Sequence, residues 1–438
     1  MGFYQATHFN KQVMINGAQV GGMNASQALK KFKTLSLKNE VSINGEVIIN
    51  GKDTKTHFTN HDITAVKDLL KKQRTWWPSS KAKNLAFIPK SSDNYREKVL
   101  KNEVSAKLKQ LNKKLKAPKD AQATLKDGKL VITKPVDGSK FDIPAMMKRY
   151  EAHQYDSQID LKAIRLKPLD PKSRTVTAEK KLLQNLQKQT VAYKVQSKSY
   201  PFAAADFIQD ASVSKTMKLS VNDQQVKAKL SEINQKQSTL NKNFAFKTHA
   251  GSTISVKGQS YGWALHVPAE AKRIITALEK GKKSIKAYNV YGVGFSTYGV
   301  GYHNQSSNNI GNTYAEVSIK EQKIWLYRNG RLVVSTNVVT GRHDTNEDTP
   351  TGVWYIEYKQ SPSTLEGSEA GNANYKVKVK YWAPFTLSGC GFHDAPWRHN
   401  WSSNAYLTQG SGGCINTPPG VMKEVYDNLS QNEPVIIY

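Results

Sequence analysis

Residues 323–341, "KIWLYRNGRLVVSTNVVTG", carry the strongest fold signal in the chain. Two apolar runs rich in β-branched and aromatic residues flank Asn329 and Gly330, and an Asn-Gly pair in that setting predicts a β-hairpin. The nearby segments "YAEVSI", "GVWYIEYK" and "VKVKYWAPF" have the same texture, and the clearest helix pattern among them is "GVMKEVYDNL". We therefore predict a mostly-β C-terminal domain, a sandwich or barrel-like sheet with one short helix.

Before this domain, helix and strand patterns alternate. Asn24 is suited to cap a helix whose apolar face begins at Ala25, and "VPAEAKRIITALEKG" has a proline in its first turn and a glycine at its end. The Lys-rich "NKKLKAPKDA" is typical of a linker. We predict a multidomain α+β protein with units at 1–112, 113–308 and 309–438. The first unit is interpreted as a divergent repeat of the second.

Charge and cysteine content limit the classes of function. The chain has 438 residues, a net charge of +29 and two cysteines, which excludes a disulfide-dense scaffold. A basic surface attracts anionic polymers, but the lysines are spread along the chain and no zinc-finger spacing is present, which disfavours nucleic acid. No apolar run of about 18 residues and no charged-then-apolar leader is present, so we expect any signal or anchor to lie outside this chain.

Cys414 has the surroundings of a nucleophile. Gly412 and Gly413 precede it, so the backbone can bend sharply and direct its N–H groups at a substrate carbonyl. A cysteine nucleophile needs a base, and His393, 21 positions earlier, is the natural candidate. The alternatives are a small buried thiol for Cys414 and a structural histidine near aromatic residues for His393.

The two stretches "HDAPW" and "SGGCIN" together resemble the signature of L,D-transpeptidases. That family has a histidine, a spacer of similar length, then Ser or Thr, His, Gly, Cys, an apolar residue and Asn. The resemblance extends over roughly residues 312–438 and departs from the pattern at Gly412, where the family usually has a second histidine. The matching positions are His393, Ser411, Gly413, Cys414, Ile415 and Asn416.

The resemblance implies a mechanism without metal or cofactor. Cys414 would attack the carbonyl before the terminal D-Ala of a peptidoglycan stem tetrapeptide, with His393 as base and Gly413 and Cys414 N–H groups as oxyanion donors. A side-chain amine of a second stem would then resolve the thioester into a 3→3 cross-link. A backbone carbonyl, from Ser411 or Asp394, would orient His393. The residues expected near the substrate are Asn416, Trp397, Ser388, Gly412 and Asp394.

The middle unit, in "FAFKTHAGSTISVKGQSYGWALHVPAEAKRIITALEKG", is similar to a peptidoglycan-binding domain that precedes this catalytic domain in Gram-positive enzymes. The implied partners are donor and acceptor stem peptides, with anionic wall polymers as further ligands and no nucleic acid. The implied location is the extracellular face of the cell envelope or the cell wall, with the full-length protein anchored in the membrane. The implied process is cell-wall and cell-shape maintenance.

Two alternatives to cross-linking stay open at this stage. One is an L,D-carboxypeptidase, in which water resolves the same thioester, and the other is a non-catalytic wall-binding protein with a degenerate site. Cys390 in "SGCGFH" is interpreted as a buried small side chain, with a regulatory bridge to Cys414 as the alternative. His399 is interpreted as a solvated side chain.

Overall fold

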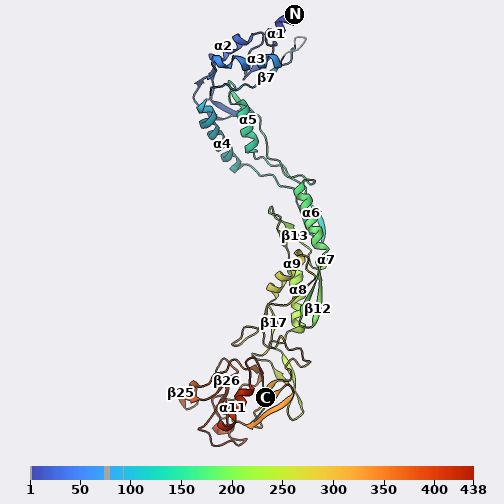
Figure 1. Cartoon of the computed structure of the whole chain (residues 1–438), viewed down its shortest axis with the longest axis vertical. Helices are drawn as coiled ribbons and strands as arrows, with labels where there is room; N and C mark the ends of the chain where they lie inside the picture. Colours follow the sequence, from blue (N-terminus) through green and yellow to red (C-terminus); the bar gives the residue numbers. More distant parts are fainter. Residues whose placement is uncertain (1, 74–78, 92) are drawn as a thin grey trace. The chain divides into compact units, whose positions relative to one another are not determined.

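The computed structural model describes residues 2–73, 79–91 and 93–438 (Figure 1). The chain divides into two compact units, which are described separately. Unit 1 comprises Met1–Ala123 and Ile132–Lys180, and unit 2 comprises Thr124–Val131 and Lys181–Tyr438. Within the described residues, none of the helices has the length and apolar character needed to cross a membrane. The three-domain division expected from the sequence stays a prediction.

Among the residues described in unit 1, one hydrophobic core lies around Phe32 and another around Tyr150. Its small sheets have the strand orders β2-β1-β7, β10-β4-β5 and β3-β6. The elements are α1 (Gly2–Thr7), β1 (Val13–Ile15), β2 (Ala18–Gln19), α2 (Ala25–Lys33), β3 (Ser36–Leu37), β4 (Glu40–Ile43), β5 (Glu46–Asn50), β6 (Thr54–Lys55), a 3₁₀ turn (Asn60–Asp62), α3 (Ile63–Lys72), β7 (Lys83–Leu85), a π-helical turn (Tyr95–Leu100), α4 (Lys101–Lys114), α5 (Ile143–His153) and β10 (Ile159–Leu161).

Helix α2 begins where the sequence predicts. Asn24 accepts a hydrogen bond from the Gln27 N–H at 2.8 Å, and the Gln27 side chain accepts one from the Asn24 N–H at 2.9 Å. This reciprocal pair satisfies two of the N–H groups that a helix start leaves unpaired. The predicted apolar face, which includes Ala25 and Phe32, is buried. Of the predicted linker, residues 112–121, the first three belong to α4, which ends at Lys114.

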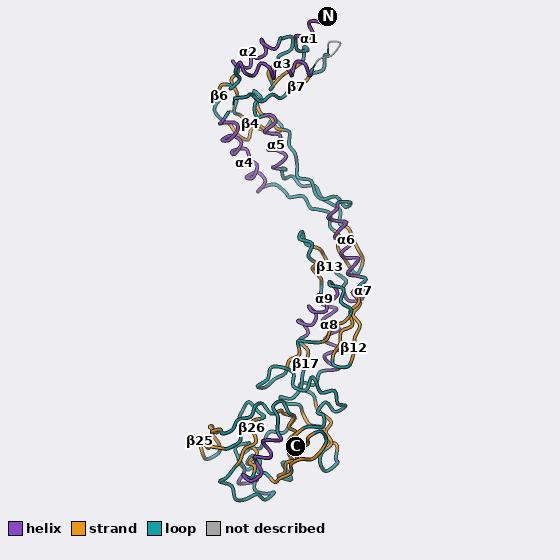
Figure 2. The backbone as a smooth tube through the Cα atoms, viewed as in Figure 1, coloured by secondary structure: helices purple, strands orange, loops and turns teal. Residues whose placement is uncertain are grey.

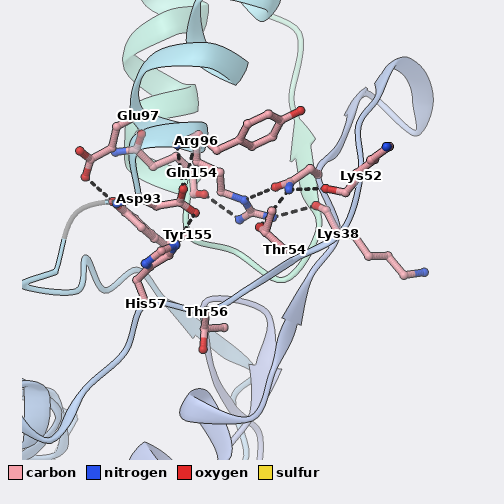
Figure 3. A network of polar contacts seen from close by, with 12 residues as sticks. Lys38, Lys52, Thr54, Thr56, His57, Asp93, Arg96, Glu97, Gln154 and Tyr155 are labelled. Carbon is pink, nitrogen blue, oxygen red and sulfur yellow. Dashed lines mark hydrogen bonds and ion pairs between the residues drawn. The ribbon is translucent and has the colours of Figure 1, made fainter.

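Arg96 is fully buried in unit 1, where Figure 3 shows its guanidinium surrounded by oxygen atoms. Its Nη1 donates to the carbonyl oxygens of Gln154 and Asp156, both at 2.7 Å, and Nη2 donates to that of Lys38 at 2.8 Å. Its Nε donates to Asn39 Oδ1 at 2.6 Å. A buried charge is tolerated only when its donors are paired, as here. Arg96 therefore ties together three segments that are distant in sequence.

The N-terminal part of unit 2 alternates helices and short strands, with strand orders β14-β13-β8-β9, β12-β11-β18, β15-β16 and β17-β19. The predicted helix forms as α9, with Pro268 in its first turn and Ile274 and Leu278 buried. The elements, the first three of which extend across the unit boundary, are β8 (Ala123–Lys126), β9 (Lys129–Ile132), α6 (Arg174–Gln187), β11 (Thr190–Val195), β12 (Lys198–Ala203), α7 (Ala204–Phe207), β13 (Ala211–Val213), β14 (Leu219–Val221), α8 (Gln224–Gln237), β15 (Asn243–Lys247), β16 (Thr253–Lys257), β17 (Ala264–Leu265), α9 (Val267–Glu279), β18 (Ser284–Lys286) and β19 (Val290–Tyr291).

The C-terminal part of unit 2 is mostly strands joined by long loops (Figure 2). A five-stranded sheet has the order β22-β21-β20-β29-β23, and a three-stranded sheet has the order β26-β27-β28. The elements are β20 (Tyr314–Ser318), β21 (Lys323–Arg328), β22 (Arg331–Asn337), β23 (Gly352–Tyr355), β24 (Ser363–Glu369), β25 (Asn372–Val379), β26 (Trp382–Pro384), β27 (Gly391–Asp394), α10 (Tyr406–Gln409), β28 (Ile415–Thr417), α11 (Pro419–Asn428) and β29 (Pro434–Ile437).

The predicted hairpin is confirmed. Arg328 pairs with Arg331 across the turn, and Asn329 and Gly330 both have positive φ, 51° and 79°. Such a two-residue turn matches the right-handed twist of the strands on either side. Helix α11, which is labelled in Figure 1, buries Met422 and Val425 in the core. The mixed multidomain architecture with a mostly-β C-terminal domain is thereby confirmed, with the four-residue α10 as an additional short helix.

Candidate active site

Strands β27 and β28 are parallel neighbours that bring the two predicted motifs together. Their register pairs Phe392 with Ile415 and His393 with Asn416. Phe392 and Ile415 belong to the hydrophobic core. Because side chains alternate along a strand, His393 and Asn416 share the opposite face, and Cys414, two residues before Asn416, shares it too. The thiol lies 3.4 Å from the Gly389 carbonyl oxygen.

This face opens into a pocket of about 670 Å³. Seven of the nine residues predicted for the site line it, and Gly413 and Asp394 lie outside the lining. The β24–β25 hairpin forms one wall, through residues 363–369 and Tyr375. The predicted residues on the lining are Ser388, His393, Trp397, Ser411, Gly412, Cys414 and Asn416.

Ser411 fixes the turn that carries the nucleophile candidate. Its Oγ donates to the Cys414 carbonyl at 2.5 Å and accepts from the Gly413 N–H at 3.2 Å. The hydroxyl of Thr349 donates to the Gly413 carbonyl at 2.8 Å. The Gly413 N–H, expected as an oxyanion donor, is therefore engaged by Ser411 in this structure. The Ser411 carbonyl accepts from the Arg342 N–H at 2.8 Å, so it is also occupied.

His393 is oriented by the carbonyl of Asp394. Its Nδ1 lies 2.9 Å from that oxygen, so Nδ1 carries the proton and Nε2 keeps a lone pair. We assign the orientation of the Asn416 amide from the hydrogen-bond network. In this orientation its nitrogen donates to His393 Nε2 at 3.1 Å and its oxygen accepts from Arg398 Nη2 at 2.9 Å. The tautomer that results is the one a general base requires.

The other predicted contact residues have different surroundings. The Asp394 carboxylate accepts from the N–H groups of Lys380 and Tyr381, at 2.8 and 2.9 Å, which holds the chain between β25 and β26. Trp397 is 43% exposed and stacks on His393 with ring centroids 5.8 Å apart, so it offers its ring to the pocket. Ser388 Oγ donates to the Thr386 hydroxyl at 3.0 Å.

Burial sets the protonation of the resting site. It raises the pKa of the Cys414 thiol to about 12, and the nearby Cys390 and Glu369 add negative potential that acts in the same direction. Burial lowers the pKa of His393, although the Asp394 carbonyl opposes this. The free site at neutral pH therefore holds a thiol beside a neutral imidazole, and proton transfer must accompany substrate attack.

We expect the acylation rate to follow the deprotonation of His393. Because the His393 pKa is lowered, the rate should rise to half its maximum below pH 6.5 and stay level from pH 7 to pH 9, where the thiol is still protonated. Single-turnover acylation from pH 4 to pH 9 measures this. A rate that climbs tenfold per pH unit between pH 7 and pH 9 would indicate a thiolate formed in bulk equilibrium and contradict the assignment.

Cys390 and Cys414 are both free thiols. Cys390 packs against the hydrophobic core, and burial raises the pKa of its thiol. A Cβ added to Gly413 would lie 2.9 Å from Cys390 Sγ. Cys390 is therefore partly buried, and its interpretation as a buried small side chain stays a prediction. His399 is exposed.

Comparison with known proteins identifies the C-terminal domain. Residues 312–437 match the family model of the L,D-transpeptidase catalytic domain, and residues 180–286 match that of a "Putative peptidoglycan binding domain". The catalytic domain of the Enterococcus faecium L,D-transpeptidase is 37% identical, with 97% of that chain covered. The chain belongs to the L,D-transpeptidase family. No curated protein sequence matches it.

Further solved structures are similar to parts of this chain. The match to the Enterococcus faecium catalytic domain covers 29% of the present chain and has a TM-score of 0.27. The same domain acylated by ertapenem is also 37% identical with a TM-score of 0.27, and 98% of that domain's chain is covered. A longer crystal structure, a Cys-to-Ser mutant of the Enterococcus faecium enzyme, is 24% identical, covers 59% of this chain and 98% of its own, and has a TM-score of 0.47.

Sequence reasoning did not find three polar residues of the L,D-transpeptidase pocket: Glu369, Tyr375 and Arg398. Arg398 follows Trp397 directly, so its place beside the motif was a usable signal. Glu369 and Tyr375 lie on the hairpin, and nothing in their local sequence indicates the pocket. Among the residues that the structure describes, no group of three or more His, Cys, Asp or Glu side chains has an arrangement suited to a metal ion.

We expect Gly413→Ala to impair the L,D-transpeptidase site without touching a reacting group. Gly413 has φ +113°, and the added Cβ would contact Cys390 Sγ. Backbone strain of this kind costs about 1–3 kcal/mol. Thermal unfolding should show a lower midpoint, and the rate of acylation should fall. The double variant with Cys390→Ala should recover part of the loss by relieving the contact, whereas no recovery would mean that backbone strain alone is responsible.

Proposed function

We propose that the protein forms 3→3 cross-links between peptidoglycan stem peptides through a thioester on Cys414. The observation that carries this is the pairing of β27 with β28, which presents His393 and Cys414 on one face of one pocket. The Enterococcus faecium relative whose catalytic domain is acylated by ertapenem supports an acyl-enzyme in this family. The peptidoglycan-binding domain model at residues 180–286 supports a wall polymer as the substrate.

Acylation begins when the donor carbonyl approaches the thiol. His393 Nε2 takes the thiol proton as the C–S bond forms, and the Cys414 N–H supports the oxyanion. The protonated imidazole then gives its proton to the nitrogen of the departing D-Ala, and the C–N bond breaks. Asp394 holds the ring through its carbonyl, and Nε2, which accepts from the Asn416 amide in the resting site, exchanges that hydrogen bond for the thiol proton.

Deacylation by an amine distinguishes a transpeptidase from a carboxypeptidase. In the first case the side-chain amine of a second stem peptide attacks the thioester carbonyl, and in the second case water does. Incubation of the full chain with a purified disaccharide-tetrapeptide, followed by mass spectrometry, separates these functions. Dimers lacking one D-Ala support the proposal, and tripeptide monomers alone indicate the carboxypeptidase. Unchanged substrate indicates the third alternative, a wall-binding protein without catalysis.

The setting of this reaction is the outer side of the cell envelope. We place the protein there, in a Gram-positive cell wall, held by a membrane anchor outside this chain, with a role in cell-wall organisation and cell shape. The net charge of +29 suits a matrix of anionic wall polymers, which would concentrate the protein near its substrate. The N-terminal unit would serve as a further wall-binding repeat.

A further inference from the structure

We infer that the carboxylate of Glu369 binds the ammonium group of the acceptor stem peptide and directs that amine toward the thioester on Cys414. The inference rests on the proposed function, because it concerns the second half of the same reaction. It assigns a specificity role to a residue of the β24–β25 hairpin. It also gives a physical reason for the glycine at position 412.

Glu369 lies directly against the turn that carries Cys414. It is the last residue of β24 and lines the pocket together with Gly412 and Cys414. A Cβ built on Gly412 would lie 3.1 Å from Glu369 Cβ and 3.7 Å from Glu369 Oε2. A larger side chain at 412 would therefore compete for the space that Glu369 uses. The carboxylate and Cys414 line the same pocket, so a ligand held by one is near the other.

A cation bound next to Glu369 would stabilise its negative charge. Burial raises its pKa, and the nearby Glu347 carboxylate raises it further, while an Asn372 hydrogen bond and the Arg398 charge lower it. Arg398 acts on it as a nearby charge, and the hydrogen bonds of Arg398 described here go to other acceptors. Nη2 and Nε face Asn416 Oδ1, and Nη1 donates to the Gln409 carbonyl at 2.5 Å.

Glu347 is held in place by local bonds. Its Oε1 accepts from the Ala370 N–H and its Oε2 from the Thr345 hydroxyl, both at 2.6 Å. A positively charged ligand would therefore be attracted most strongly to Glu369 from the side that faces the pocket. Both stem peptides carry a side-chain ammonium, but in the proposed reaction only that of the acceptor must reach the thioester carbon, and we assign Glu369 to it. Charge-assisted hydrogen bonds of this kind are short and directional.

The transfer step balances with Glu369 in this role. The bound ammonium loses one proton, through the carboxylate, to solvent and becomes a free amine. Its nitrogen forms a C–N bond to the thioester carbonyl carbon as the C–S bond breaks. The second amine proton passes through His393 to the departing sulfur. The products are an amide, the regenerated thiol and one proton in solution.

The test compares a cationic and a neutral acceptor in Glu369→Gln. The donor is the disaccharide-tetrapeptide, and the acceptors are a stem tripeptide that ends in L-lysine and hydroxylamine, which is an uncharged nucleophile near neutral pH. We expect the tripeptide concentration for half-maximal transfer to rise about tenfold. This is the change in affinity expected when one charge-assisted hydrogen bond is lost at a partly exposed site. Because hydroxylamine carries no positive charge, transfer to it should change much less than transfer to the tripeptide, and D-Ala should still be released.

The controls separate this inference from the proposed function. Glu424→Gln removes an equal charge from the exposed face of α11. It should alter transfer to neither the tripeptide nor hydroxylamine. Unchanged use of the tripeptide by Glu369→Gln, or an equal loss with both acceptors, would overturn the role of Glu369 while D-Ala release still upheld the proposed function. A wild-type chain that releases no D-Ala would overturn both.

Discussion

Cys414→Ala should abolish formation of a covalent adduct with a carbapenem and reduce D-Ala release by at least about 10³-fold, because no other group in the pocket can form the thioester. Ser411, the nearest hydroxyl on the same turn, is committed to the Cys414 carbonyl. Intact-mass analysis after exposure to the carbapenem measures the adduct directly. The wild type should gain one inhibitor mass and the variant none.

Cys390→Ala is the matched control for that experiment. It removes the second thiol of the chain, which packs on the core side of Gly413 and lies outside the pocket lining. This variant should still gain one adduct. An adduct that persists in Cys414→Ala and vanishes in Cys390→Ala would move the nucleophile to the other cysteine and overturn the proposed mechanism.

Arg96→Leu should destabilise unit 1 by about 3–5 kcal/mol, the usual cost of breaking a buried charged network. The substitution leaves three carbonyl oxygens and the Asn39 side chain without their donor. Native-state hydrogen exchange of the full chain, read by mass spectrometry on peptides that contain α4 and α5, measures the loss locally. Exchange in these peptides should accelerate by a factor of about 10²–10⁴.

Lys148→Leu, on the exposed side of α5, is the control for Arg96→Leu. It also replaces a long cation with leucine, but it should change exchange by less than about threefold, as surface substitutions usually do. Peptides from unit 2 should exchange at the wild-type rate in both variants. Equal exchange in Arg96→Leu and the wild type would show that the buried network contributes little to stability.

The local sequence was sufficient to predict structure where a short stretch of residues determines its own backbone geometry. Asn329 and Gly330 dictate their turn, and Asn24 with Gln27 dictates the start of α2, because every partner lies within a few residues. The pairing of His393 with the Cys414 turn is a contact between strands 21 residues apart, and only the motif resemblance indicated it in advance.

Sequence reasoning was weakest where the partners of a residue are main-chain atoms or solvent. Arg96 sits in a Lys-rich stretch and bonds mainly to carbonyl oxygens from other segments, so no side-chain pattern reveals its burial. The β24–β25 hairpin is largely exposed and polar, so it lacks the apolar alternation that marks a strand with one buried face. Glu369 was missed for the same reason.

The protonated sulfur of the resting site has a consequence for chemical selectivity. Peroxide and simple alkylating reagents react with thiolates, so they should modify this enzyme slowly. A compound that places an acyl carbon next to the sulfur allows the thiol proton to pass to the imidazole as the sulfur attacks. Peroxide and simple alkylating reagents do not promote this proton transfer. The site therefore favours inhibitors that imitate the substrate's approach over those that rely on intrinsic reactivity, and it should tolerate an oxidising environment.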